Sequence, residues 1–95
     1  MNIAILSGEL GQAAKIKDAG SSKVANSFLT FKNIKGVNEA IRIAAWGNQA
    51  DELQKYQQGT MIVVEGRYNV LSIEREGGFK EKVLELNISK IHGVN

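Results

Sequence analysis

The chain has 95 residues, of which 43% are hydrophobic and 23% charged, and its net charge is +2. This composition indicates one compact domain over residues 1–95 and excludes a disordered chain, and the longest apolar runs, such as Met61–Val64, are far shorter than the roughly 20 residues of a membrane-spanning helix. With no cysteine and with His92 as the single histidine, the chain lacks the parts for a disulfide, a thiolate or histidine metal site, or a catalytic triad. We therefore expect a protein that is not an enzyme and that uses no cofactor.

The N-terminal segment MNIAILSGEL predicts a first strand over Asn2–Leu10. Gly8 and Gly11 are expected to bend this strand before it continues through residues 15–17. The segment has neither the basic region nor the extended apolar region of a signal peptide. We therefore expect a location inside a cell.

Two further strands are predicted to form a hairpin. The turn formers of DAGSSK, residues 18–23, indicate a loop before a β-rich run at Val24–Lys32. The next segment, NIKGVN, contains Gly36, which can adopt a positive φ at low cost in a turn. A third strand then runs from Glu39 to Trp46.

A short helix is predicted in NQADELQKYQQG, residues 48–59. Asn48 is the expected N-cap, Asp51 lies three residues later where an acidic group is favourable, and Gly59 is the expected stop. The apolar residues of this segment form a narrow stripe on one face.

Two long β-type runs follow the helix, TMIVVEGRYNVLSIER and KEKVLELNISKI, joined by EGGF at residues 76–79. The paired glycines predict a hairpin. Three strands, a helix and two strands give an all-β fold in the order of the OB-fold, a five-stranded Greek-key barrel that often binds oligonucleotides.

Alternation along the third strand separates Ile41, Ile43 and Ala45, the expected core residues, from Arg42 and Trp46 on the opposite face. On the second strand, Phe28, Thr30 and Lys32 form one set. A hairpin centred near Gly36 and Val37 would place Lys32 opposite Arg42, Thr30 opposite Ala44 and Phe28 opposite Trp46. Two rings and two cationic groups on one surface are what a binder of single-stranded nucleic acid needs, so the candidate binding site consists of Phe28, Thr30, Lys32, Arg42 and Trp46.

Aromatic faces can stack bases at about 1 to 3 kcal/mol each, and each neutralised phosphate of a single strand contributes roughly 0.7 to the salt dependence. Two other interpretations of these residues stay open. Trp46 could instead be buried in the core or in a subunit interface, and Arg42 with Lys32 could be ordinary solvated charges. Individual lysines in or beside loops are weak evidence for a phosphate contact; these are Lys15, Lys17, Lys23 and Lys35.

Three segments resemble bacterial single-stranded DNA-binding proteins: VANSFLTF at residues 24–31, IRIAAWGNQADEL at 41–53 and KYQQGTMIVVEGR at 55–67. The resemblance implies an OB-fold homodimer or homotetramer that binds single strands largely without sequence preference, in DNA replication, recombination or repair. It also implies a base-stacking role for Trp46 and a basic contact at Arg42, whereas Phe28 replaces the small polar residue usual at its position.

The chain departs from the family pattern at several points. NIKGVN is shorter than the family's long basic hairpin, and Ala40 and Ile73 stand where aromatic rings are often found. The sequence ends at IHGVN, without the acidic tail that recruits partner proteins. It is thus similar to short tailless relatives, such as primosomal helper proteins or the small cyanobacterial and plastid versions, which implies the bacterial nucleoid or the plastid stroma.

Two alternatives remain beside single-stranded DNA binding. One is an OB-fold oligomer that has lost strong DNA binding and serves as a structural or protein-interaction module. The exposed edges of the first strand, with Ile3 and Ile5, and of the last hairpin would then serve assembly. The other is RNA binding, because OB-folds accept either sugar.

Overall fold

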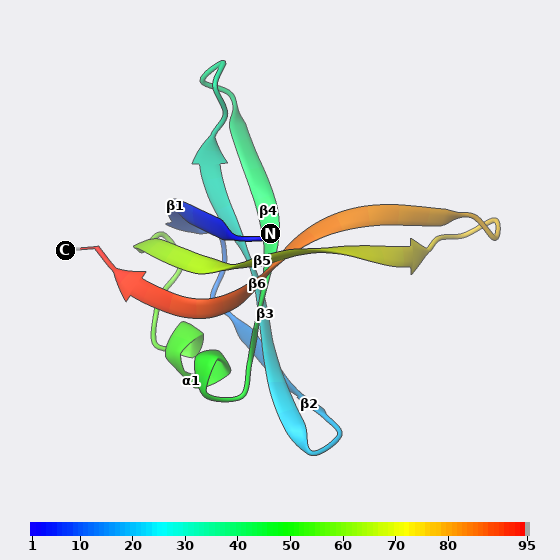
Figure 1. The fold of residues 1–95 in the computed structure, drawn as a ribbon, viewed down its shortest axis with the longest axis horizontal. Helices are drawn as coiled ribbons and strands as arrows, with labels where there is room; N and C mark the ends of the chain where they lie inside the picture. Colours follow the sequence, from blue (N-terminus) through cyan, green and yellow to red (C-terminus); the bar gives the residue numbers. More distant parts are fainter. Residues whose placement is uncertain (95) are drawn as a thin grey trace.

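The computed structural model describes residues 1–94 and consists of strands and one short helix (Figure 1). The elements in chain order are β1 (Ala4–Leu10), β2 (Lys15–Ala19), β3 (Ser22–Lys32), β4 (Asn38–Trp46), α1 (Asn48–Gln54), β5 (Met61–Glu74) and β6 (Lys80–Gly93). The predicted order of strands and helix is confirmed, with the expected first strand divided into β1 and β2. The predicted loop at residues 18–23 is wrong in extent, because β2 and β3 are joined at residues 20–21, where Gly20 has a φ of 69°. Within residues 1–94 there is no helix with the length and apolar character needed to cross a bilayer.

The strands form one sheet that closes on itself. Their order is β1-β5-β6-β4-β3-β2, and β1 also pairs with β3, so that five strands form a ring and β2 extends it beside β3. The pairing of β4 with β6 is parallel and the other pairings are antiparallel. Gly8 lies where β1 crosses β3, and a Cβ there would be 2.4 Å from the carbonyl oxygen of Thr30, so this crossing requires glycine.

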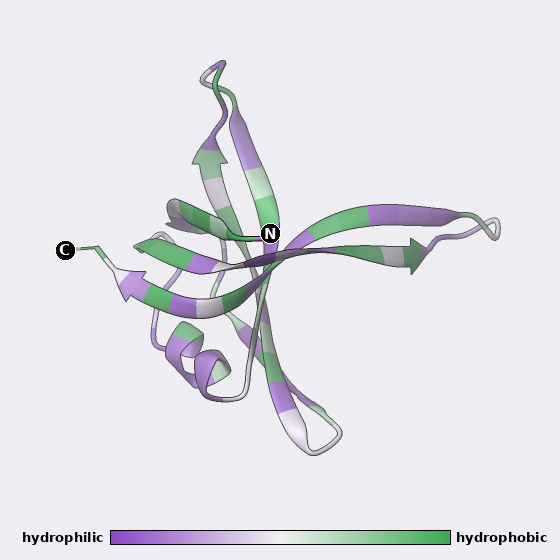
Figure 2. Ribbon diagram, viewed as in Figure 1, coloured by the Kyte–Doolittle hydropathy of each residue, from purple (hydrophilic) through white to green (hydrophobic). Residues whose placement is uncertain are grey.

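The core fills the inside of the ring. The expected core residues Ile41, Ile43 and Ala45 are buried there, which confirms the predicted inner face of β4. They pack with other fully buried side chains, which are Leu10, Leu29, Leu53, Ile62, Val64 and Leu86. Each such side chain contributes about 1.5 to 3 kcal/mol by leaving water. Figure 2 shows the matching alternation of hydrophobic and hydrophilic bands along the strands.

Helix α1 lies against one end of this ring and buries Ala50 and Leu53. Its predicted ends are wrong. Gly47, with a φ of 58°, is the N-cap in place of Asn48, and its N–H still donates to the Lys23 carbonyl of β3. The helix therefore begins directly where the β3–β4 pairing stops.

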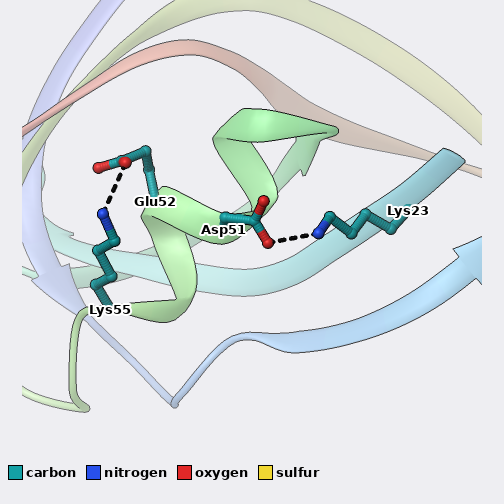
Figure 3. A network of polar contacts seen from close by, with 4 residues as sticks. All are labelled: Lys23, Asp51, Glu52 and Lys55. Atoms are coloured by element: carbon teal, nitrogen blue, oxygen red, sulfur yellow. Dashed lines mark hydrogen bonds and ion pairs between the residues drawn. The ribbon is translucent and has the colours of Figure 1, made fainter.

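Polar contacts hold the outer side of α1 (Figure 3). Asp51 makes no capping hydrogen bond and instead pairs with Lys23 of β3, with 2.6 Å between Nζ and Oδ1. Lys55 lies 2.9 Å from Glu52, and this hydrogen bond raises the pKa of Lys55. The helix ends at Gln54, and Gly59 lies in the following turn, where its N–H donates to the Leu10 carbonyl.

The β3–β4 hairpin and the longer β5–β6 hairpin project from the ring in different directions, and the β2–β3 hairpin projects on a further side (Figure 1). The predicted turn of the longer hairpin is confirmed, because Gly77 and Gly78 both have positive φ and the Arg75 N–H donates to the Phe79 carbonyl. The β3–β4 strands carry the candidate site, and the β5–β6 hairpin lies beside it.

Candidate nucleic-acid interface

The β3–β4 hairpin sets the register of the candidate site. Phe28 lies opposite Arg42, and Val24 lies opposite Trp46. The predicted register, with Phe28 opposite Trp46, is therefore wrong by four residues. Because four is an even number, the shift leaves each side chain on its predicted face of the sheet.

Asn33 is the physical reason for this register. Its side-chain oxygen accepts hydrogen bonds from the N–H groups of Lys35 and Val37, and its own N–H donates to the Val37 carbonyl. Such a side-chain turn closes the loop at residues 33–37, earlier than a two-residue turn at Gly36 and Val37 would. Gly36, with a φ of 78°, occupies the third position after Asn33.

Trp46 and Phe28 both point away from the core. Trp46 is 49% exposed and Phe28 is 42% exposed, whereas Ala45 and Leu29 beside them are buried. The indole is thus displayed on the outer face of the monomer, as the alternation predicts. Their positions four residues apart in register separate the two rings by roughly 13 Å along the strands. The predicted ring pair is replaced by two separate aromatic platforms.

Strand β2 adds two lysines that the sequence analysis left aside. Lys15 pairs with Asn26 and Lys17 pairs with Val24, so that both project from the same face as Phe28, Arg42 and Trp46. Alternation in KIKDA, with Ile16 between the lysines, predicts that Lys15 and Lys17 share a face. Only the pairing of β2 with β3 shows that this face is the one with Phe28. We name the outward surface of these three strands the β2–β4 face. Its residues are Lys15, Lys17, Asn26, Phe28, Arg42 and Trp46, with Thr30 and Lys32 toward the hairpin tip.

The β2–β4 face is hollowed beside Phe28. A recess of about 290 Å³ is lined there by Lys15, Lys17, Asn26, Phe28 and Arg42, together with Gln12 and Ser27. Trp46 lies outside this recess, at the end of β4. The structure thus gathers Phe28 and three cationic side chains at one place.

Arg42 has a partner that the sequence analysis missed. Its Nε lies 2.9 Å from Oε2 of Glu85 on β6, which is buried, and Asn87 Nδ2 is 3.4 Å from the other carboxylate oxygen. The parallel pairing of β4 with β6 brings Arg42 and Glu85 side by side although they are 43 residues apart. No local pattern could reveal this contact.

Thr30 and Lys32 lie farther from Trp46 than the predicted register places them, because they pair with Ala40 and Asn38. The Thr30 hydroxyl donates to the Glu9 carbonyl of β1 at 3.2 Å, so it ties β3 to β1. Lys32 lies opposite Asn38 next to the turn and is exposed. These two predicted site residues share the face with Trp46 but lie at its opposite end.

A second groove, of about 750 Å³, continues from Phe28 and Arg42 between the β3–β4 hairpin and the β5–β6 hairpin. Its apolar walls include Phe31, Ile73 and Val83, and Ala40 also lines it. Its charged side chains are of both signs: Arg75 and Lys82 with Glu39 and Glu81, of which Arg75 and Glu81 form an ion pair at 2.9 Å. The groove thus extends the β2–β4 face with an apolar surface that carries little net charge.

This surface joins flat aromatic faces to several cations along neighbouring strands. Such an arrangement can bind an extended polyanion that carries planar groups, since bases stack on rings and phosphates pair with lysine and arginine.

Comparison with known proteins agrees with this chemistry. The model of the single-strand binding protein family matches residues 1–94. A thylakoid-associated single-stranded DNA-binding protein of Synechocystis sp. is 41% identical over 54 residues, which are 56% of this chain and 42% of that protein. The chain therefore spans less than half of that relative. The crystal structure of an SSB domain from Synechococcus sp. is 27% identical, with a TM-score of 0.81 over 97% of this chain and 94% of that one.

Proposed function

The chain belongs to the single-strand binding protein family and has its OB-fold, and on that premise we propose that it binds single-stranded DNA on the β2–β4 face, largely without sequence preference. Trp46 and Phe28 each stack a base, and Arg42, Lys15 and Lys17 contact phosphates. Lys32 and Thr30 contact the strand toward the hairpin tip. The protein acts by binding, as an accessory to DNA replication, recombination or repair, and catalyses no reaction.

The observation that carries this proposal is the half-exposed indole of Trp46 on one face with Phe28 and three cations. Stacking on two rings contributes about 2 to 6 kcal/mol in total. Phosphate contacts add a salt-dependent term of roughly 0.7 per neutralised charge. The carboxylate of Glu85 offsets one of the cations, so the affinity is weak to moderate.

A titration of fluorescently labelled oligo(dT) at low salt tests the proposal. We expect a rise in anisotropy of the label together with quenching of Trp46 emission. If high micromolar protein produces no rise in anisotropy and no quenching of Trp46 emission, the proposed function is refuted. Affinity that survives the combined substitution Trp46→Ala and Arg42→Ala would place the site elsewhere on the protein.

Assembly is a second part of the proposal. Ile3, just before β1, and Ile5, on β1, are 64% and 66% exposed, and β1 pairs with β5 so that Ile5 lies beside Glu65. β1 pairs with β3 only at Glu9 and Leu10, so its first residues form a free edge, and exposed apolar side chains at such an edge favour contact with a second copy. Each chain is a single OB-fold domain, and two or four copies form the homodimer or homotetramer. Light scattering distinguishes these from a monomer, which would contradict this part.

A different function is favoured by the exposed apolar side chains of the β5–β6 hairpin, Tyr68, Val70 and Leu84. These could bind another protein if the module has lost DNA affinity. RNA in place of DNA is tested by competition between matched oligomers. The bacterial nucleoid or the plastid stroma is the location that fits the proposed ligand.

A further inference from the structure

Arg42 is held by one edge of its guanidinium only. Its Nε donates to Glu85 Oε2 at 2.9 Å, and among residues 1–94 neither terminal nitrogen, Nη1 or Nη2, donates a hydrogen bond to a protein group. The Arg42 side chain is 35% exposed and that of Glu85 is 8% exposed. The anchored edge is therefore the covered one, and the terminal nitrogens remain for a ligand.

A guanidinium fixed in this way suits a phosphate. Arginine binds phosphate oxygens through two parallel N–H groups, and the geometry of that contact depends on the plane of the guanidinium. Phe28 lies directly opposite Arg42 on β3. A base stacked on Phe28 thus brings its phosphate to the free edge of Arg42.

The same carboxylate also opposes the ligand. Glu85 is a nearly buried negative charge on β6, beside β4 at the edge of the β2–β4 face, and a phosphate on Arg42 is repelled by it at short range. Burial of a carboxylate is costly unless it is paired and hydrogen-bonded, and Arg42 and Asn87 supply these partners. Glu85 therefore both orients Arg42 and weakens the attraction of Arg42 for a phosphate.

We propose that Glu85 is a positioning residue for Arg42 that also sets a ceiling on single-stranded DNA affinity. The inference rests on the proposed function. Strand β6 lies beyond the strands that carry the aromatic residues, yet through Glu85 it controls how tightly the DNA is held. Binding that is limited in this way is easily reversed, as suits a protein that must give up its strand.

Two substitutions separate orientation from charge. Glu85→Gln keeps an oxygen that accepts from Arg42 Nε but removes the negative charge. Glu85→Leu removes both while keeping a similar volume. Glu65→Gln is the matched control, because it deletes the same charge at a carboxylate bonded to His92 outside the β2–β4 face. Circular dichroism and thermal melts confirm that each variant is folded.

Anisotropy titrations with labelled oligo(dT) at several salt concentrations give the result. We expect Glu85→Gln to bind roughly three- to tenfold tighter at low salt, with a salt slope steeper by up to about 0.7. Glu85→Leu is expected to bind at least about threefold more weakly than Glu85→Gln, and Glu65→Gln within about twofold of the wild type. The NMR signal of the Arg42 Nε–H, recorded without DNA, should stay protected from exchange in Glu85→Gln and lose protection in Glu85→Leu.

Several results would overturn the inference. If Glu85→Gln fails to tighten binding while the wild type binds, Glu85 sets no ceiling. Equal affinities of the Gln and Leu variants would show that charge acts alone and that Arg42 needs no positioning. Absence of DNA binding by the wild type and all variants would instead refute the proposed function, and this inference with it.

Discussion

Separate substitution of Phe28 and Trp46 by alanine tests whether the two rings act as independent platforms. Each ring is about half exposed, so a base can cover it without rearrangement of the core. Loss of one stacked base costs about 1 to 3 kcal/mol, which weakens binding roughly 5- to 150-fold. The rings are roughly 13 Å apart along the strands, so their effects should add within about 0.5 kcal/mol in the double variant.

Anisotropy of a labelled oligo(dT) measures all three variants, because the signal does not depend on Trp46. Tyr68→Ala is a suitable control, since Tyr68 has a similar exposure but lies opposite Leu86, on the other side of the sheet from Glu85. An unchanged affinity in both single variants would refute the stacking role. A double variant no weaker than either single one would mean that the two rings share one base, as the rejected register implies.

Three further predictions concern charge, backbone fit and packing. Combined substitution of Lys15 and Lys17 by alanine should lower the salt slope of oligo(dT) binding by about 1.4, and an unchanged slope would remove β2 from the interface. Gly66→Ala should reduce the free energy of unfolding by about 3 kcal/mol or more in denaturant melts, because a Cβ there would lie 1.9 Å from the Asn87 carbonyl oxygen. Leu53→Ala should cost about 2 to 5 kcal/mol, whereas Asp51→Asn, which breaks only the exposed pair with Lys23, should cost at most about 1 kcal/mol. Equal losses for these two would contradict the view that α1 is held by its apolar side.

Side-chain alternation made the faces of β3 and β4 predictable. Trp46 and Arg42 lie outside and Ile43 inside because the period of a strand is two, whatever its register. The register itself depended on the side chain of Asn33, which competes with Gly36 for control of the turn. A turn centred on Gly36 and Val37 gives a register that is wrong by four residues, and this register incorrectly places the two rings opposite each other.

Contacts between distant segments could not be read from the sequence. The pairing of β2 with β3 brings Lys15 and Lys17 to the candidate site, and the parallel pairing of β6 with β4 brings Glu85 beside it. At the helix, Asn48 has the usual chemistry of an N-cap. Gly47 took that place because its N–H remains bonded to β3, a tertiary constraint that outweighs local preference.

In the proposed complex, a single strand of DNA lies across the β2–β4 face. The most direct test is a titration of ¹⁵N-labelled protein with unlabelled oligo(dT), followed by NMR. We expect the largest shifts at the indole N–H of Trp46 and at the amides of Lys15, Phe28 and Arg42, with little change on α1. Shifts confined to α1 or to β1, with the Trp46 indole unmoved, would contradict the account.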